Sequence, residues 1–403
     1  MQRSERVINS ERAFVVALGV EDMVRELLLR DLRGEEGGGN DYYVRRFDRD
    51  GDGYNDIQSE KWSLPFTFTN SPVKGMDVRW CVHDLNGFID LNLLASSDEQ
   101  TRDYTKKAVL ALIEILFKKK EEDSYLLQST SPDEVVDDED TLALEELITS
   151  HGIDIDTYAL RAANALMDWF DEDNDVREPG GAEVDDYLYD EQKYPYLPAN
   201  GMRMAWPDEV RLIKGYHERN YYLSENILPY VTAIPVEHEA IRSQDSEGKE
   251  AENYRLAINI NTAPTQVLKA IIRSRGEIGR GLGAAIDETV ASKLYPPWPS
   301  LPPSYYRFTD VNDFCRRIGL LNRGDKGNKE CKTLENFFFT THSKYFQLDV
   351  ELKLGSTGSW LMQSLFHRQG DDDNEKDVFV LQRSMNRSSY HRNTNLYRWR
   401  RCH

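Results

Sequence analysis

The sequence predicts an α+β protein in which an N-terminal helix packs on a small antiparallel sheet and a large all-α domain is inserted between the strands. Three observations predict this arrangement. Residues 1–34 have apolar residues at helical spacing, residues 62–94 and 343–387 alternate as strands do, and the region between them is mainly helical. Neither strand-rich part completes a sheet alone, so we expect them to combine. The expected domains are residues 1–95 with 343–403, and an inserted domain at residues 96–342.

The N-terminal helix is predicted from an apolar stripe. Ala13, Ala17, Val20, Val24, Leu27 and Leu28 lie on one helical face, and the glycines at 34 and 37–39 end the pattern. The 403-residue chain has no apolar run of about 18 residues, so no segment of it is expected to cross a bilayer.

The strands are predicted from period-two alternation. The first strand-rich part contains FTFT at 66–69 and a longer run at 76–94, where Asn86-Gly87 marks a tight turn. The second contains 343–355, 359–369 and 376–387. In 343–355 one face carries Phe346, Leu348, Val350 and Leu352, and the other carries Gln347, Asp349, Glu351 and Lys353.

Helical segments fill most of the region between these parts. They are expected at 105–120, 142–152, 206–216, 222–231 and 262–276. Asp208 and Thr262 each stand at the expected start of a helix and are predicted N-caps.

Residues 260–290 resemble a helix-hairpin-helix, a unit that can bind phosphate through glycine turns. Read alone, this segment suggests nucleic-acid binding. Its cations are only Lys269, Arg273, Arg275 and Arg280, and the chain has a net charge of −20 and a pI near 4.9. Nucleic-acid binding needs a cationic face, so we favour a structural use and expect no nucleic-acid partner.

An acidic stretch at residues 165–187 is the strongest candidate site. It begins as a helix with Ala159, Leu160, Ala163, Leu166, Met167 and Phe170 on one stripe. Within nineteen positions it then places a dense run of carboxylates that includes Asp168, Asp171, Asp173, Asp175, Glu178, Glu183, Asp185 and Asp186. So many carboxylates repel one another, and a hard divalent cation such as calcium, with roughly six to eight oxygen ligands, would stabilise them. The alternative is a solvated acidic loop.

A second acidic loop lies at residues 47–57. Asp48, Asp50, Asp52 and Asp56 resemble the first half of a calcium loop, with Gly53 at the turn. The closing glutamate is one residue late, at Glu60. A shortened calcium loop and a simple Asp-Gly turn both fit this pattern.

Motifs of enzymatic catalysis are not recognisable in the sequence. There is no nucleophile elbow, zinc-protease motif or phosphate-binding glycine loop. The paired carboxylates of DWFDED could serve glycoside hydrolysis, but that chemistry needs one carboxyl kept protonated in an apolar pocket. A dense anionic turn fits a cation site better, and we predict a protein that is not an enzyme.

Several motifs resemble, in order, those of the type II secretion minor pseudopilin family known as general secretion pathway protein K. These motifs are DLNGFIDLN (84–92), DWFDED (168–173), GGAE (180–183), PYLPANG (195–201), DEVRLIKG (208–215), LPYVTAIP (228–235) and INTAPTQVL (260–268). The chain departs from the family at Val184, where an acidic residue usually follows the glutamate. This departure affects the ligands after Val184, whereas Asp171 and Asp173 lie within a motif that follows the family pattern.

The resemblance implies a calcium-binding, non-enzymatic subunit that caps the tip of the periplasmic pseudopilus, initiates its assembly with minor pseudopilins I and J, and supports protein export. The implied calcium ligands are Asp171, Asp173, Asp175, Glu183 and Asp186, while Asp168 is expected to orient the loop. The family's first helix begins as an inner-membrane anchor, and residues 1–34 look like its rear half. We therefore expect that an anchor preceded Met1.

The resemblance also bears on the four cysteines, at 81, 315, 331 and 402, because it implies an oxidising compartment. Cys315 and Cys331 would close a short loop. A disulfide between them and a reduced, buried thiol are both compatible with the sequence.

Overall fold

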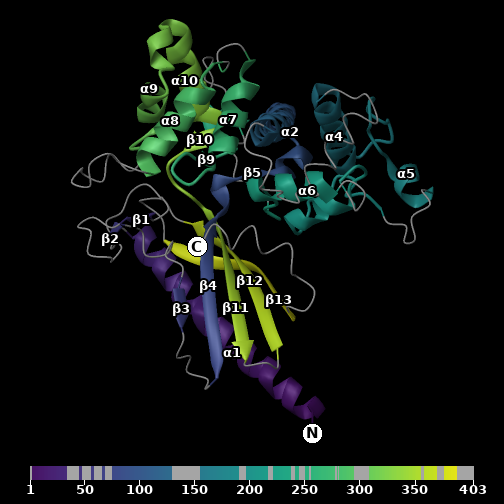
Figure 1. The fold of residues 1–403 in the computed structure, drawn as a ribbon, viewed down its shortest axis with the longest axis vertical. Helices are drawn as coiled ribbons and strands as arrows, with labels where there is room; N and C mark the ends of the chain where they lie inside the picture. The colour runs from purple at the N-terminus through teal and green to yellow at the C-terminus, as the bar shows by residue number, and fades with distance from the viewer. Residues whose placement is uncertain are drawn as a thin grey trace.

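A computed structural model describes residues 2–33, 45–47, 56–58, 66–68, 75–128, 155–189, 197–216, 221–236, 241–244, 250–253, 256–276, 279, 281–294, 308–354, 358–369 and 376–387. The first helix and a sheet occupy one end of an elongated molecule, and most other helices gather at the opposite end (Figure 1). The N-terminus lies at the far tip of the sheet end. The chain is therefore a mixed α+β protein with an antiparallel sheet, as predicted.

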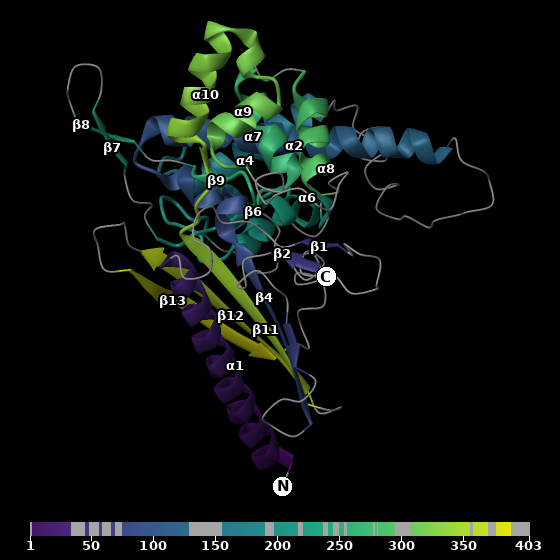
Figure 2. The ribbon, with the colours of Figure 1, turned by 90° about the vertical axis from the view of Figure 1, so that its left-hand side faces the viewer.

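Helix α1 (Gln2–Leu32) runs along one face of the sheet (Figure 2). Its predicted apolar face packs on the sheet: Ala13, Ala17, Val24 and Leu28 are fully buried, and Val20 is 6% exposed. This burial of one stripe, rather than helix propensity alone, holds a helix of this length to the rest of the chain.

The sheet has five strands in the order β13-β12-β11-β4-β3, and every neighbouring pair is antiparallel. The strands are β3 (Phe66–Phe68), β4 (Met76–Asp84), β11 (Tyr345–Leu354), β12 (Gly358–Gln369) and β13 (Asp377–Arg387). The three C-terminal strands match their predicted positions within two residues. Strands from both ends of the chain thus form one sheet.

The two faces of β11 differ as its alternation predicts. Phe346, Leu348, Val350 and Leu352 are buried against α1, with 0% exposure. On the other face, Asp349 is also buried, and it accepts hydrogen bonds from Gln347 (2.8 Å) and Gln363 (2.9 Å).

The tight turn predicted at Asn86-Gly87 is present, but the strand expected to continue after it is mostly replaced by further turns. Two 3-10 turns, η2 (Leu85–Gly87) and η3 (Leu91–Ala95), follow β4, and they flank β5 (Ile89–Asp90). The reason is local: the carboxylates of Asp84 and Asp90 each accept a hydrogen bond from the backbone N–H two residues later, at 2.8 and 3.0 Å. Such bonds favour turns over the extended conformation that the alternation suggests.

The region between the sheet strands is mainly helical. Its helices are α2 (Glu99–Gln128), α4 (Ile155–Phe170), α5 (Val184–Tyr189), α6 (Tyr221–Ile227), α7 (Thr265–Ser274), α8 (Gly283–Leu294), α9 (Val311–Arg317) and α10 (Asp325–Phe337), with 3-10 turns η4 (Pro207–Leu212), η6 (Leu228–Tyr230) and η9 (Leu321–Arg323). Residues 142–152, expected to be helical, lie outside the described residues.

The prediction that this region is all-α is wrong, because it contains short strands. Strands β5 and β6 (Val231–Thr232) pair in parallel, as do β9 (Ile258–Asn259) and β10 (Phe339–Thr340). Strands β7 (Ile241–Gln244) and β8 (Glu250–Asn253) pair antiparallel. Strands of two residues carry too little alternation to be recognised in a sequence.

The junction between the sheet and the helices is centred on Asp84, at the end of β4. Its fully buried carboxylate accepts hydrogen bonds from Ser343 (2.5 Å), Thr262 (2.6 Å) and Asn259 (3.1 Å). Thr262 therefore does not cap α7, whose N-cap is Pro264. Asp208 is likewise no N-cap, because it lies inside η4 after Trp206.

A disulfide joins Cys315 of α9 to Cys331 of α10, with their Cα atoms 6.1 Å apart. Of the two states that the sequence left open for these cysteines, the structure has the disulfide. Among the described residues, no helix has the length and apolar character needed to cross a membrane.

Candidate metal centre

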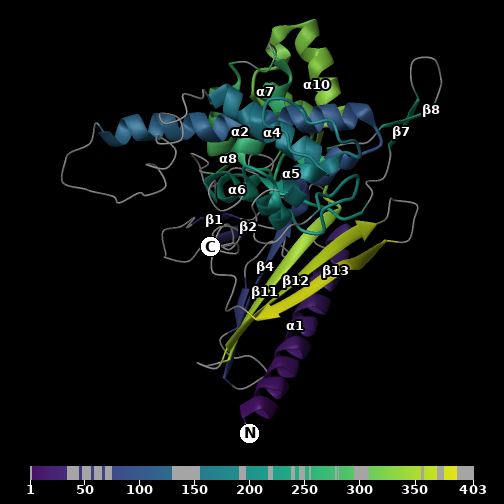
Figure 3. The same ribbon diagram turned by 90° about the vertical axis from the view of Figure 1, so that its right-hand side faces the viewer.

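The acidic stretch begins where α4 ends, and the chain around it is tightly ordered. The backbone N–H groups of Asn200 and Gly201 donate to the carbonyl oxygens of Trp169 (3.1 Å) and Phe170 (2.9 Å), which closes the helix C-terminus. Trp169 is buried and meets the ring of Tyr187 edge to face, with centroids 5.3 Å apart. These contacts fix the start of the acidic loop against α5 (Figure 3).

The stripe predicted for α4 needs one correction. Ala159, Ala163, Leu166, Met167 and Phe170 are buried, whereas Leu160 is 36% exposed. The buried face of α4 instead includes Ala162 and Asp168. The first carboxylate of the acidic site therefore lies on the face of the helix that packs on the core.

Asp168 orders the loop, which is the role expected for it. One of its oxygens, Oδ2, accepts hydrogen bonds from the backbone N–H groups of Arg177 and Ala182, both at 3.0 Å. Its other oxygen is 2.6 Å from Nη1 of Arg177. Gly181 makes this closure possible, because a Cβ atom there would lie 2.0 Å from Asp168 Oδ2.

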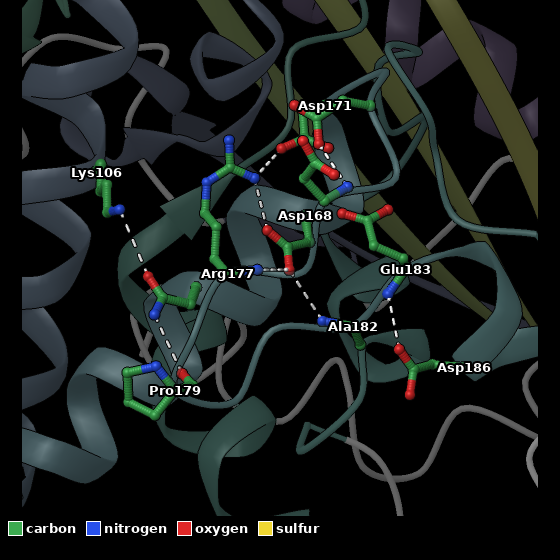
Figure 4. Close-up of polar contacts among 11 residues, drawn as sticks. Lys106, Asp168, Asp171, Arg177, Pro179, Ala182, Glu183 and Asp186 are labelled. Carbon is green, nitrogen blue, oxygen red and sulfur yellow. Dashed lines mark hydrogen bonds and ion pairs between the residues drawn. The ribbon is translucent and has the colours of Figure 1, made fainter.

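Three carboxylates converge in this loop: Asp168, Asp171 and Glu183 each place an oxygen within 4.8 Å of the other two (Figure 4). Arg177 also forms an ion pair with Asp171. Two buried oxygens of the cluster, Oδ1 of Asp171 and Oε1 of Glu183, have no hydrogen-bond donor among the described residues. Buried carboxylate oxygens normally have a partner, and a cation held among the three carboxylates would supply one to both.

The electrostatics agree with this geometry. Burial, followed by repulsion from Asp171 and Asp168, raises the pKa of Glu183 to about 7. Burial also raises the pKa of Asp171, although Arg177 opposes this. When all three carboxylates are ionised, the single guanidinium leaves the cluster with a charge of −2. A divalent cation with oxygen ligands, such as calcium, fits both the charge and the donor set.

The structure separates the other predicted ligands from this cluster. Asp173 and Asp175 are exposed at the rim, where Asp173 accepts a hydrogen bond from the Asp175 N–H at 2.9 Å. Asp186 instead lies 2.7 Å from Lys214 and accepts the Glu183 N–H at 3.0 Å. Burial would raise the pKa of Asp186, but these two hydrogen bonds lower it.

The position of Val184 explains why Asp186 faces away from the cluster. Val184 is the first residue of α5, so Asp186 is the third, and from there its carboxylate reaches back to the Glu183 N–H as in a capping box.

In the second acidic loop, Asp48, Asp50 and Asp52 lie outside the described residues, and Asp56 begins strand β2 (Asp56–Gln58), which pairs with β1 (Arg45–Phe47).

Sequence reasoning missed Arg177, which neutralises part of the cluster. A lone arginine among carboxylates (DEDNDVREPGG) was the available signal. A bound metal ion and an arginine side chain can each neutralise the carboxylates of an acidic loop. The sequence alone did not show which of the two is present here.

Three of the four cations named for residues 260–290 are held by the protein's own carboxylates, and the fourth, Arg280, lies outside the described residues. Lys269 pairs with Asp287 at 2.5 Å, Arg273 with Glu114 at 2.6 Å and Arg275 with Glu330 at 2.5 Å. Gly279 lets the turn between α7 and α8 approach closely, since a Cβ there would lie 1.8 Å from the Ile272 carbonyl oxygen. These pairings support structural use of the helical pair, and its helix-hairpin-helix identity stays a prediction.

Comparisons with known proteins agree on one family. Residues 87–236 match the family model described as "Type II secretion system (T2SS), protein K". The fold is similar to a chain of the crystal structure of the GspK-GspI-GspJ complex from the enterotoxigenic Escherichia coli type 2 secretion system, with a TM-score of 0.57 and 18% identity over 95% of this chain and 99% of that one. No curated protein sequence matches the chain.

Proposed function

We propose that this chain, which belongs to the protein K family of the type II secretion system, is a minor pseudopilin that caps the tip of a periplasmic pseudopilus. One observation supports a position at the tip. The N-terminus of α1 lies at one end of the sheet, and the helical region projects beyond the other end (Figure 1). A subunit of this shape can join a filament through α1, but its bulk blocks the place of the next subunit. It is a structural component of secretion rather than an enzyme.

The partners that we propose are minor pseudopilins I and J, in a complex like the one in which the similar structure was solved. Helix α1 offers the surface. Val7, Ile8 and Val15 are exposed by 53%, 47% and 67%, on the side of the helix away from the buried stripe. Exposed apolar patches of this kind mark protein interfaces.

The proposed complex can be tested by mixing the purified chain with the I and J subunits of the same secretion system and measuring the mass in solution. A particle with the mass of a heterotrimer is expected. Val15→Glu should weaken the complex, whereas Leu197→Glu, at a residue 65% exposed in the helical region, should not. Absence of the heterotrimer with the unchanged chain would refute the proposed assembly.

We also propose that the complex carries calcium at Asp171 and Glu183, with Asp168 beside them and Asp173 at the rim. The support is the pair of buried carboxylate oxygens without a donor. Metal analysis of the purified chain should find calcium, and Asp171→Asn should abolish it. Asp208→Asn, which removes an exposed carboxylate elsewhere, is the matched control.

For the full-length protein we propose a periplasmic location with an anchor in the inner membrane that precedes the helix α1 seen here. This location follows from the family.

A further inference from the structure

A basic cap stands out on this acidic protein. Between residues 316 and 332 there are six Lys and Arg residues and two acidic ones, in a chain whose net charge is −20. The exposed members of the basic cap are Arg316, Arg323, Lys326, Lys329 and Lys332. Such a local reversal of sign affects which partners a surface attracts.

The basic cap lies at one pole of the molecule. It comprises the end of α9, the turn η9 and the first two turns of α10, which lie at the end opposite the α1 N-terminus in Figures 1, 2 and 3. If the proposed function is right, this pole points away from the inner membrane. It is therefore the part of the subunit that would first meet components beyond the tip.

The lysines of the basic cap form one continuous face of α10. Lys326, Lys329 and Lys332 recur every three residues, opposite the buried Cys331 and Leu334. None of the three has an ion-pair partner within the described part of the chain, in contrast to Lys269, Arg273 and Arg275. The carboxylate of Asp325 shares this face.

The backbone that carries the charges of the basic cap is held in place by a disulfide and by a close backbone contact. The Cys315–Cys331 disulfide ties α10 to α9. Gly327 packs so closely that a Cβ atom would lie 2.1 Å from the Leu320 carbonyl oxygen. A partner can therefore bind these charges without first ordering the backbone that carries them.

We infer that the basic cap is a docking surface for the acidic face of another protein, distinct from minor pseudopilins I and J. Complementary charge steers association and suppresses wrong partners. A protein fits better than a bilayer, because the large exposed apolar side chains of the described residues lie elsewhere and the basic cap offers none for insertion. A nucleic acid does not fit a periplasmic location.

The probe for this inference is a fluorescent glutamate-rich peptide, whose binding to the full chain is followed by anisotropy at low salt. The double variant Lys326→Gln/Lys329→Gln should bind it about five-fold more weakly, in line with the usual worth of exposed ion pairs. Asp325→Asn should bind about two-fold more tightly. The matched control, Lys107→Gln/Lys353→Gln, removes two exposed positive charges elsewhere and should leave binding unchanged.

Three results would overturn the inference: no binding by the unchanged chain, equal weakening by the control, or binding to phosphatidylglycerol vesicles but not to the peptide. The last would assign the basic cap to a lipid surface. The assay uses neither the I and J subunits nor calcium. A negative result in the peptide assay therefore does not contradict the proposed function. Conversely, the double variant Lys326→Gln/Lys329→Gln should still form the heterotrimer with the I and J subunits.

Discussion

Removing the cation should make stability depend on pH in a specific direction. In the folded, metal-free chain the pKa of Glu183 is about 7, against 4.5 for an ordinary glutamate. Between these two values the folded state holds a proton that the unfolded state has released. The free energy of unfolding must therefore fall as the pH rises from about 5 to about 8.

The size of this fall follows from the two pKa values. At 1.36 kcal/mol per pKa unit, the difference for Glu183 corresponds to at most about 3 kcal/mol. For a folding unit of about 250 residues, each kcal/mol moves the melting temperature by about 2 °C, so the expected fall is up to about 6 °C. Calcium should cancel it, because the ion binds the ionised carboxylate and only in the folded state.

The assay is thermal unfolding followed by circular dichroism at pH 5, 6, 7 and 8, with chelator and with calcium. Glu183→Gln keeps the shape of the side chain but removes its titration, so its melting temperature with chelator should fall clearly less than that of the unchanged chain; Asp171, whose pKa is also raised, still titrates. Glu178→Gln removes a neighbouring exposed carboxylate and should behave like the unchanged chain. A metal-free melting temperature that does not fall, or that falls equally in Glu183→Gln, would refute the reasoning.

Three further perturbations test other parts of the structure by urea unfolding. Arg177→Gln should destabilise the metal-free chain by about 2–4 kcal/mol, because it leaves paired buried carboxylates without their cation, and calcium should restore most of the loss. Asp84→Ala should cost about 3 kcal/mol, since three buried donors lose their acceptor; a loss below about 1 kcal/mol would contradict the central role of Asp84 at the junction. Cys331→Ser should cost about 3 kcal/mol, and reductant should then destabilise the unchanged chain by about that much more than the variant, which keeps the disulfide of Cys81.

Much of the sheet was predictable because its strands obey a strict alternation. The residues of β11 with even numbers are apolar and bury against α1, so the pattern located both the strand and its core face. The alternation failed after the predicted Asn86-Gly87 turn, where the Asp90 carboxylate accepts the backbone N–H of Asn92 and favours a second turn over a strand. Local hydrogen bonds of this kind are not visible in hydrophobic patterning.

The acidic centre was predictable in position but only partly in composition. The density of carboxylates and the glycine turn located the loop, whereas Asp171, Glu183 and the ordering role of Asp168 were implied by the family resemblance. Asp186, which the family resemblance named as a ligand, lies apart from the cluster because its carboxylate accepts the Glu183 N–H at the start of the next helix. Arg177 was missed for a related reason: an acidic loop can contain its own counter-ion.

The shared sheet also dictates an order of events during biogenesis. The stripe of α1 packs on residues such as Phe346 and Met362, more than 300 positions later in the chain. During synthesis the apolar face of the first helix therefore has no sheet to pack on until nearly the whole polypeptide has been made. Contacts this distant form slowly, and the waiting segment is prone to aggregate. A chaperone that shields α1 until the last strands arrive would meet this need.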